Sequence, residues 1–131
     1  MKPRVYLAGG MKSDWHEKVI EQCGNDFIFY NPKLHLLDKG SEYTVWDLHH
    51  VRQSDILFAY LEESNPSGIG LSLEIGLAIG LNKTVIFIDE KSEMSEEYQS
   101  RFKILRNAAS ITLNNLDDGI TLLQSFTRGI H

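Results

Sequence analysis

The chain alternates short apolar segments with segments whose apolar residues recur at helical spacing, and this alternation limits the folds it can adopt. β-Branched and aromatic residues dominate five short runs, which predict strands at about 4–8, 27–30, 56–61, 84–88 and 110–113. We expect helices between and after them, at about 15–23, 42–53, 71–79, 96–109 and 119–128. Such alternation is typical of a parallel sheet with right-handed crossovers, so we predict an α/β protein.

Five such units favour a flavodoxin-like or Rossmann-like sheet in the order 2-1-3-4-5, with helices on both of its faces. The 131 residues, 42% of them hydrophobic, fit one domain over residues 1–131. A lone cysteine, Cys23, cannot form an intrachain disulfide or a four-cysteine metal site, and it fits a reducing compartment. No apolar run suits a signal peptide or a membrane span, so we predict a cytoplasmic protein without a membrane partner.

The charge balance argues against binding to nucleic acid polymers. Thirteen basic and eighteen acidic residues give a formal net charge of −5, which repels a polyanion, and the sequence has no basic stripe. A helix N-terminus can still bind a small anion such as a phosphate through its backbone N–H groups. Small molecules are therefore the partners that the composition favours.

The predicted strand order indicates where a ligand binds. In the order 2-1-3-4-5 the crevice lies beyond the carboxyl ends of the first and third strands. Gly9 and Gly10 follow the first strand, where glycine lets the backbone approach a ligand closely. Glu74 interrupts an apolar run early in the helix after the third strand, where N–H dipoles favour its ionised form. We expect Asp47, from the preceding helix, and Tyr6 to reach the same crevice.

Two carboxylates and one phenol around a crevice suit glycosyl chemistry. One carboxylate can attack the anomeric carbon while the other acid assists the leaving group. A glutamate near a helix start is also common for dipole reasons alone, so the grouping with Asp47 and Tyr6 carries the hypothesis for Glu74. Trp15 stands where it can stack on a base, with packing in the core as the alternative.

Several well-known site patterns are missing from the sequence. There is no G-x-x-x-x-G-K-[ST] for a nucleoside triphosphate, and no G-x-G-x-x-G follows the first strand. Gly70-Leu71-Ser72-Leu73 lacks the closing glycine of a serine nucleophile elbow. The adjacent His49 and His50 have no third ligand at a useful spacing, so we expect no metal site.

Five segments, taken in their order and spacing, carry a family resemblance. They are Val5 to Gly9, Trp15, Asp47 with Asp55, Ser67 to Ala78, and Asn82 to Ile86. Together they resemble the nucleoside 2-deoxyribosyltransferase family, whose superfamily also holds nucleoside-monophosphate N-glycosidases. The resemblance covers about residues 4–90 and is weakest in the last third of the chain.

The resemblance implies a role for each candidate residue. Glu74 would be the nucleophile that forms a glycosyl-enzyme ester at C1′, Asp47 would assist departure of the base and contact the sugar, and Tyr6 would orient the nucleophile. The 5′ end of the sugar or its phosphate would bind at the loop with Ser67, Gly68 and Gly70. The resemblance also implies a homodimer or larger homo-oligomer, in which a neighbouring subunit completes the pocket.

We therefore predict an enzyme that needs no cofactor. It would cleave the N-glycosidic bond of a (deoxy)nucleoside or nucleotide through a covalent intermediate on Glu74 and transfer the sugar to another nucleobase. One alternative is hydrolysis of a nucleoside 5′-monophosphate, and another is a non-catalytic nucleotide-binding or sensing module. The spacing Gly70-x-x-x-Glu74 is also similar, less closely, to the cytokinin-activating phosphoribohydrolases. The expected substrate contacts are Gly9, Gly10, Trp15, Ser67, Gly68 and Gly70.

Overall fold

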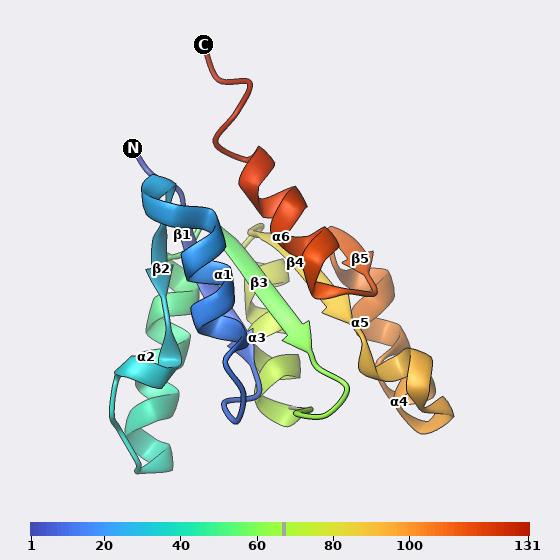
Figure 1. The fold of residues 1–131 in the computed structure, drawn as a ribbon. Helices are drawn as coiled ribbons and strands as arrows, with labels where there is room; N and C mark the ends of the chain where they lie inside the picture. Colours follow the sequence, from blue (N-terminus) through green and yellow to red (C-terminus); the bar gives the residue numbers. More distant parts are fainter. Residues whose placement is uncertain (67) are drawn as a thin grey trace.

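A twisted parallel sheet forms the centre of the molecule (Figure 1). The computed structural model describes residues 1–66 and 68–131. In these residues the strands are β1 (Arg4–Gly9), β2 (Ile28–Tyr30), β3 (Ile56–Leu61), β4 (Thr84–Asp89) and β5 (Ile111–Leu113). They pair in the order β2-β1-β3-β4-β5, and every pairing is parallel. The predicted α/β class and strand order are confirmed.

Helices cover both faces of the sheet (Figure 1). On one face lie α1 (Trp15–Cys23) and α6 (Leu116–Ser125); on the other lie α2 (Gly40–Gln53), α3 (Ile69–Gly80), α4 (Glu96–Arg101) and α5 (Lys103–Ala108). Short 3₁₀ helices complete the connections in the described part of the chain: η1 (Gly24–Asp26), η2 (Pro32–Leu34) and η3 (Lys91–Met94). Helices on both faces were predicted, and this too is confirmed.

Alternate residues of each strand divide the core into two parts. Val5 and Leu7 of β1 pack under α1 and α6, whereas Tyr6 and Ala8 pack under α2 and α3. This alternation follows from the two-residue period of a strand. Every residue of β3 is buried, as expected for the central strand of a sheet covered on both faces. The side chain of Tyr6 is thereby directed to the α2 and α3 face.

The predicted helices at 96–109 and 119–128 differ from the structure by more than two residues or by a break. The helix expected at 96–109 is divided into α4 and α5 at Phe102, whose buried ring packs with the α3 side of the core. The last helix begins at Leu116, three residues before the predicted start, because Asn115 Oδ1 accepts a hydrogen bond from the Asp118 N–H at 2.9 Å. Within the described residues, no helix is both long and apolar enough to cross a membrane.

Candidate active site

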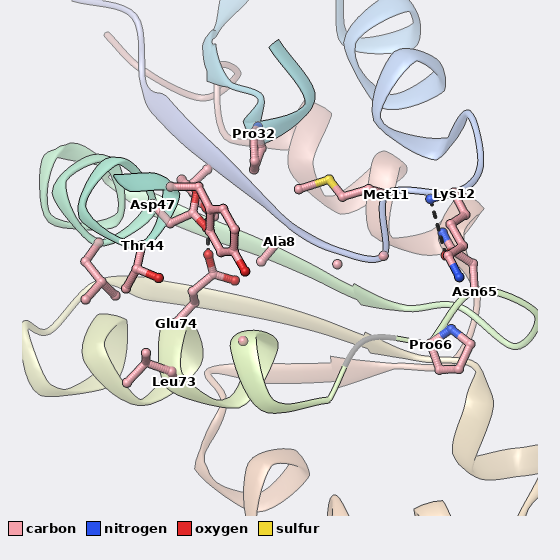
Figure 2. A pocket seen from close by; sticks show the side chains of 16 residues that line it. Ala8, Met11, Lys12, Pro32, Thr44, Asp47, Asn65, Pro66, Leu73 and Glu74 are labelled. Atoms are coloured by element: carbon pink, nitrogen blue, oxygen red, sulfur yellow. Dashed lines mark hydrogen bonds between the residues drawn. The ribbon is translucent and has the colours of Figure 1, made fainter. Parts of the chain in front are cut away.

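A cavity of about 390 Å³ lies at the carboxyl end of β1, between α2, α3 and the loop after β3 (Figure 2). This is the crevice that the strand order predicts. Its lining includes six of the residues singled out from the sequence, which are Tyr6, Gly9, Gly10, Asp47, Gly70 and Glu74. It also includes residues that the sequence did not single out, among them Lys12, Tyr43, Thr44, Asn65 and Leu73.

Glu74 reaches the cavity from the second turn of α3. Leu71, Ile75 and Ala78 anchor this helix on the sheet, and Glu74 shares their face because residues three and four apart align on a helix. The side chain is consequently 8% exposed. The Tyr6 hydroxyl donates a hydrogen bond to Glu74 Oε2 at 2.6 Å, which fixes the carboxylate from the β1 side.

Burial raises the pKa of Glu74 from its ordinary value of 4.5 to about 7. The Tyr6 hydrogen bond lowers the pKa, and the charge of Asp47 raises it further. This direction is opposite to the one expected from the helix N-terminus. The difference arises because Glu74 lies in the second turn, where the dipole effect has largely fallen off, and because it is buried among apolar side chains. The carboxyl group is therefore only partly ionised at neutral pH.

Tyr6 is a permanent hydrogen-bond donor in this site. Burial raises the pKa of its hydroxyl far above the ordinary value, and the charges of Glu74 and Asp47 add to the effect. The phenol consequently keeps its proton at any physiological pH. It can orient the Glu74 carboxylate but cannot act as a base.

Asp47 extends from the middle of α2 and points toward Glu74 across the cavity (Figure 2). Its Oδ1 atom is buried and has no hydrogen-bond partner among the described residues. The Nε2 atom of His35 lies 3.7 Å from that oxygen. Burial raises the pKa of Asp47, while the Tyr6 hydroxyl and the charges of His35 and His50 lower it. Two carboxyl groups with raised pKa values therefore face one cavity.

The two glycines after β1 let two loops approach each other. Gly9 has φ +151°, and a Cβ there would lie 2.5 Å from the carbonyl oxygen of Tyr60. A Cβ on Gly10 would collide with the backbone and side chain of Asn65. The same Asn65 accepts a hydrogen bond from the Lys12 N–H at 3.3 Å, so the loops after β1 and β3 form one wall of the cavity.

Trp15, predicted as a substrate contact with packing in the core as the alternative, lies in the core. Its ring does not line the cavity but is 2% exposed and packs beside Phe58 and Tyr60 on the opposite face of the sheet. The indole N–H donates to the carbonyl oxygen of Gly10 at 2.8 Å. Trp15 therefore supports the glycine loop from behind.

Three of the predicted contacts lie around the start of α3 in the sequence. Gly70, in the first turn of the helix, lines the cavity. Gly68 does not, and its carbonyl oxygen accepts hydrogen bonds from the N–H (3.0 Å) and the Oγ (2.8 Å) of Ser72. The prediction for Ser67 lies outside the described residues. No group of three or more His, Cys, Asp or Glu side chains in 1–66 and 68–131 could hold a metal ion.

Two cavity residues that we did not predict can be recognised from their spacing in the sequence. Tyr43 and Thr44 precede Asp47 by four and three positions, so they share its face of α2 and line the same cavity. Asn65 follows β3 in the crevice loop, and its contacts with Gly10 and Lys12, which spacing does not contain, show that it is a wall residue.

Comparison with known proteins gives two positive results and one negative one. The model of the family described as nucleoside 2-deoxyribosyltransferase like matches residues 2–92. No curated protein sequence matches the chain. Similar solved structures exist at low sequence identity, and at such identity the likeness concerns the fold.

Three of these structures span nearly the whole chain. A 2-desoxiribosyltransferase from Leishmania mexicana has 14% identity and a TM-score of 0.69, covering 98% of this chain and 99% of its own. A CMP N-glycosidase from Clostridium botulinum has 20% identity and a TM-score of 0.59, with 94% and 98% covered. A 2-deoxyribosyltransferase from Bacillus psychrosaccharolyticus has 19% identity and a TM-score of 0.60, with 88% of each chain covered.

Proposed function

Because the chain belongs to the nucleoside 2-deoxyribosyltransferase-like family, we propose that it cleaves the N-glycosidic bond of a (deoxy)nucleoside or nucleotide and transfers the sugar to another nucleobase. The observation that carries the proposal is the hydrogen bond of 2.6 Å from the Tyr6 hydroxyl to Glu74 Oε2, with Asp47 on the facing helix. A nucleophile, a group that orients it and a second carboxyl group thus line one cavity.

In the first step, the Glu74 carboxylate attacks C1′ of the sugar. Since Tyr6 occupies Oε2, Oε1 is the oxygen that forms the new C1′–O bond. The bond from C1′ to the base nitrogen breaks, and its electron pair leaves with the base. Asp47 donates the proton that the departing base needs, a role that suits a carboxyl group whose pKa is raised by burial.

In the second step, the ring nitrogen of an acceptor base attacks C1′ of the glycosyl ester. The C1′–O bond breaks, the Glu74 carboxylate is regenerated, and the Asp47 carboxylate takes up the proton that the acceptor loses. Water in place of the acceptor would give the free sugar and make the enzyme a hydrolase. The side chains of the site supply nucleophile and acid, so the proposed reaction uses no metal or organic cofactor.

The substrate contacts that we propose are backbone contacts of Gly9, Gly10 and Gly70, which line the cavity. The first turn of α3 with Gly68 and Gly70 would receive the 5′ end of the sugar, because its N–H groups have no partner within the helix.

We also propose that the protein works as a homo-oligomer in the cytoplasm. The apolar Met11, Tyr43 and Leu73 line the cavity and are exposed, so a second subunit could cover them. The lone thiol of Cys23 fits a reducing compartment. Light scattering coupled to size-exclusion chromatography measures the oligomeric state, and a monomer at assay concentration would refute the first proposal.

The test of the reaction is a chromatographic time course of free base released from deoxynucleosides, ribonucleosides and their 5′-monophosphates, with and without an added acceptor base. We expect wild type to release base and to form a new nucleoside when the acceptor is present. Glu74→Ala should abolish both, whereas Glu42→Gln, a change at an exposed glutamate of α2, should change neither.

The other outcomes discriminate among the alternatives. Base release without transfer would establish a hydrolase. Thermal stabilisation by a nucleotide without any product would indicate a binding module. Equal activity of wild type and Glu74→Ala would refute the proposed nucleophile.

A further inference from the structure

His35 lies in the loop between η2 and α2, beside Asp47 and at the edge of the candidate active site. A second cavity of about 450 Å³ adjoins the first and shares Met11, Pro32, Tyr43 and Asp47 with it. His35 lines this second cavity, and its Nε2 is 3.7 Å from Asp47 Oδ1. The proposed mechanism uses Asp47 but gives His35 no part.

The backbone fixes which ring nitrogen of His35 carries the proton. The Leu37 N–H donates a hydrogen bond of 2.9 Å to His35 Nδ1, so Nδ1 must present a lone pair. The proton of the neutral imidazole therefore sits on Nε2, the nitrogen that faces Asp47. A proton on Nδ1 would set two donors against each other.

Two rings of α2 hold the imidazole in place. The Tyr43 ring is parallel to it with centroids 6.4 Å apart, and the Trp46 ring meets it edge to face at 5.0 Å. Asp47 belongs to the same helix. The His35 side chain is 11% exposed. Two rings of α2 thus hold the His35 donor, and the same helix carries the Asp47 acceptor.

Asp47 needs a donor at this position. Its Oδ1 is buried and lacks a hydrogen-bond partner among the described residues, a costly state for a carboxylate oxygen. His50, three residues on in α2, is engaged elsewhere, since its Nδ1 contacts the carbonyl oxygen of Trp46 at 2.8 Å. The His35 Nε2–H faces the unpaired oxygen at a distance that a small movement would reduce to hydrogen-bond length.

We propose that His35 is a positioning residue for Asp47: in the substrate complex its Nε2–H donates to Asp47 Oδ1 and leaves Oδ2 to face the substrate. The proton that Asp47 delivers to the departing base then resides on Oδ2, because Oδ1 accepts the imidazole N–H. This inference rests on the proposed function for the role of Asp47. The arrangement of His35, Leu37 and Asp47 can be tested independently of any activity.

The kinetic test compares His35→Phe, which keeps a ring but removes the donor, with His35→Gln, which carries an N–H group at similar reach. We expect His35→Phe to lower kcat about tenfold or more, with KM nearly unchanged, because Asp47 becomes a carboxylate as it gives up its proton and would then lack a hydrogen bond to a charged group. His35→Gln should recover most of kcat. His49→Gln, at an exposed position of α2, is the control and should match wild type.

A double-mutant cycle separates positioning from stacking on a base. In an Asp47→Ala background His35→Phe should have little further effect on kcat, because the oxygen that His35 would position is already absent. The proposal would be overturned if His35→Phe raised KM alone, or if it lowered kcat equally in the presence and absence of Asp47.

Nitrogen-15 NMR of the histidine rings provides the readout that needs no turnover. We expect His35 to carry its proton on Nε2 and the signal of that group to shift in Asp47→Ala, which removes the acceptor oxygen, with the His49 signals unchanged. A proton on Nδ1, or an Nε2 signal that is the same in wild type and Asp47→Ala, would overturn the arrangement. Absence of base release by wild type would instead refute the proposed function and leave this measurement to decide about His35.

Discussion

Replacing Glu74 by glutamine should abolish activity and stabilise the fold above neutral pH. Because burial raises the folded-state pKa of Glu74 from 4.5 to about 7, the folded protein binds this proton more tightly than the unfolded chain does. The contribution of Glu74 to stability is therefore fully present below about pH 4.5 and is lost as pH rises through about 7. At 1.36 kcal/mol per pKa unit, the shift lowers the free energy of unfolding of wild type at pH 8 by about 3 kcal/mol relative to low pH.

Glutamine has nearly the same shape, carries no charge and can still accept the Tyr6 hydrogen bond. At pH 8 the free energy of unfolding of Glu74→Gln should therefore exceed that of wild type by up to about 3 kcal/mol. For a chain of this length this difference raises Tm by roughly 10 °C. The gain should shrink through pH 6 and vanish near pH 4.5. Urea titrations of both proteins at these three pH values measure it.

Lower stability of Glu74→Gln at pH 8, or a gain that is the same at every pH, would refute this reasoning. The pH dependence that comes from other groups cancels in the comparison, because both proteins contain them. Glu42→Gln, at an exposed glutamate, is the control and should show no pH-dependent gain.

Three further predictions follow from the same structure. Burial lowers the pKa of His16 from 6.5 to about 4, so wild type should lose up to about 3 kcal/mol of stability as pH falls from 6.5 to 4, and His16→Leu should remove most of that loss in urea titrations. The pH profile of kcat/KM for base release should be bell-shaped, because the rate rises as Glu74 ionises around pH 7 and falls again as Asp47 loses the proton that it donates, and a profile that is flat from pH 5 to 8 would contradict this. Gly10→Ala should lower stability by about 1–3 kcal/mol through its collision with Asn65, whereas Gly76→Ala, in open space on α3, should stabilise by up to about 1 kcal/mol in thermal unfolding.

The sequence predicts the fold well because its strongest signals are local. β3 is buried over its whole length and β1 from Val5 to Ala8, as expected for parallel strands covered on both faces, and the chain order of the elements then leaves few topologies. Glu74 was found for a related reason, since its place among Leu71, Ile75 and Ala78 puts a carboxylate on the packed face of a helix. The family resemblance drawn from these segments is confirmed by the match over residues 2–92.

Other features depend on contacts between distant residues, which spacing does not contain. Trp15 begins a helix whose start is close to the cavity, but its side chain turns to the α1 and α6 face and packs on Phe58. The pKa of Glu74 depends on how completely the site is buried, and the helix dipole alone predicts the opposite direction.

The loop at His35 shows most clearly what local rules miss. Leu36 has φ +58°, a left-handed conformation that favours glycine or asparagine and costs a leucine about 1 kcal/mol or more. This turn brings the Leu37 N–H onto His35 Nδ1 and so aims Nε2 at Asp47. The Leu36 side chain is almost fully exposed, so packing of that side chain does not hold the turn. The strain must be balanced by the contacts of His35 with Leu37, Tyr43 and Trp46, and it lies beside the carboxyl group that the proposed reaction requires.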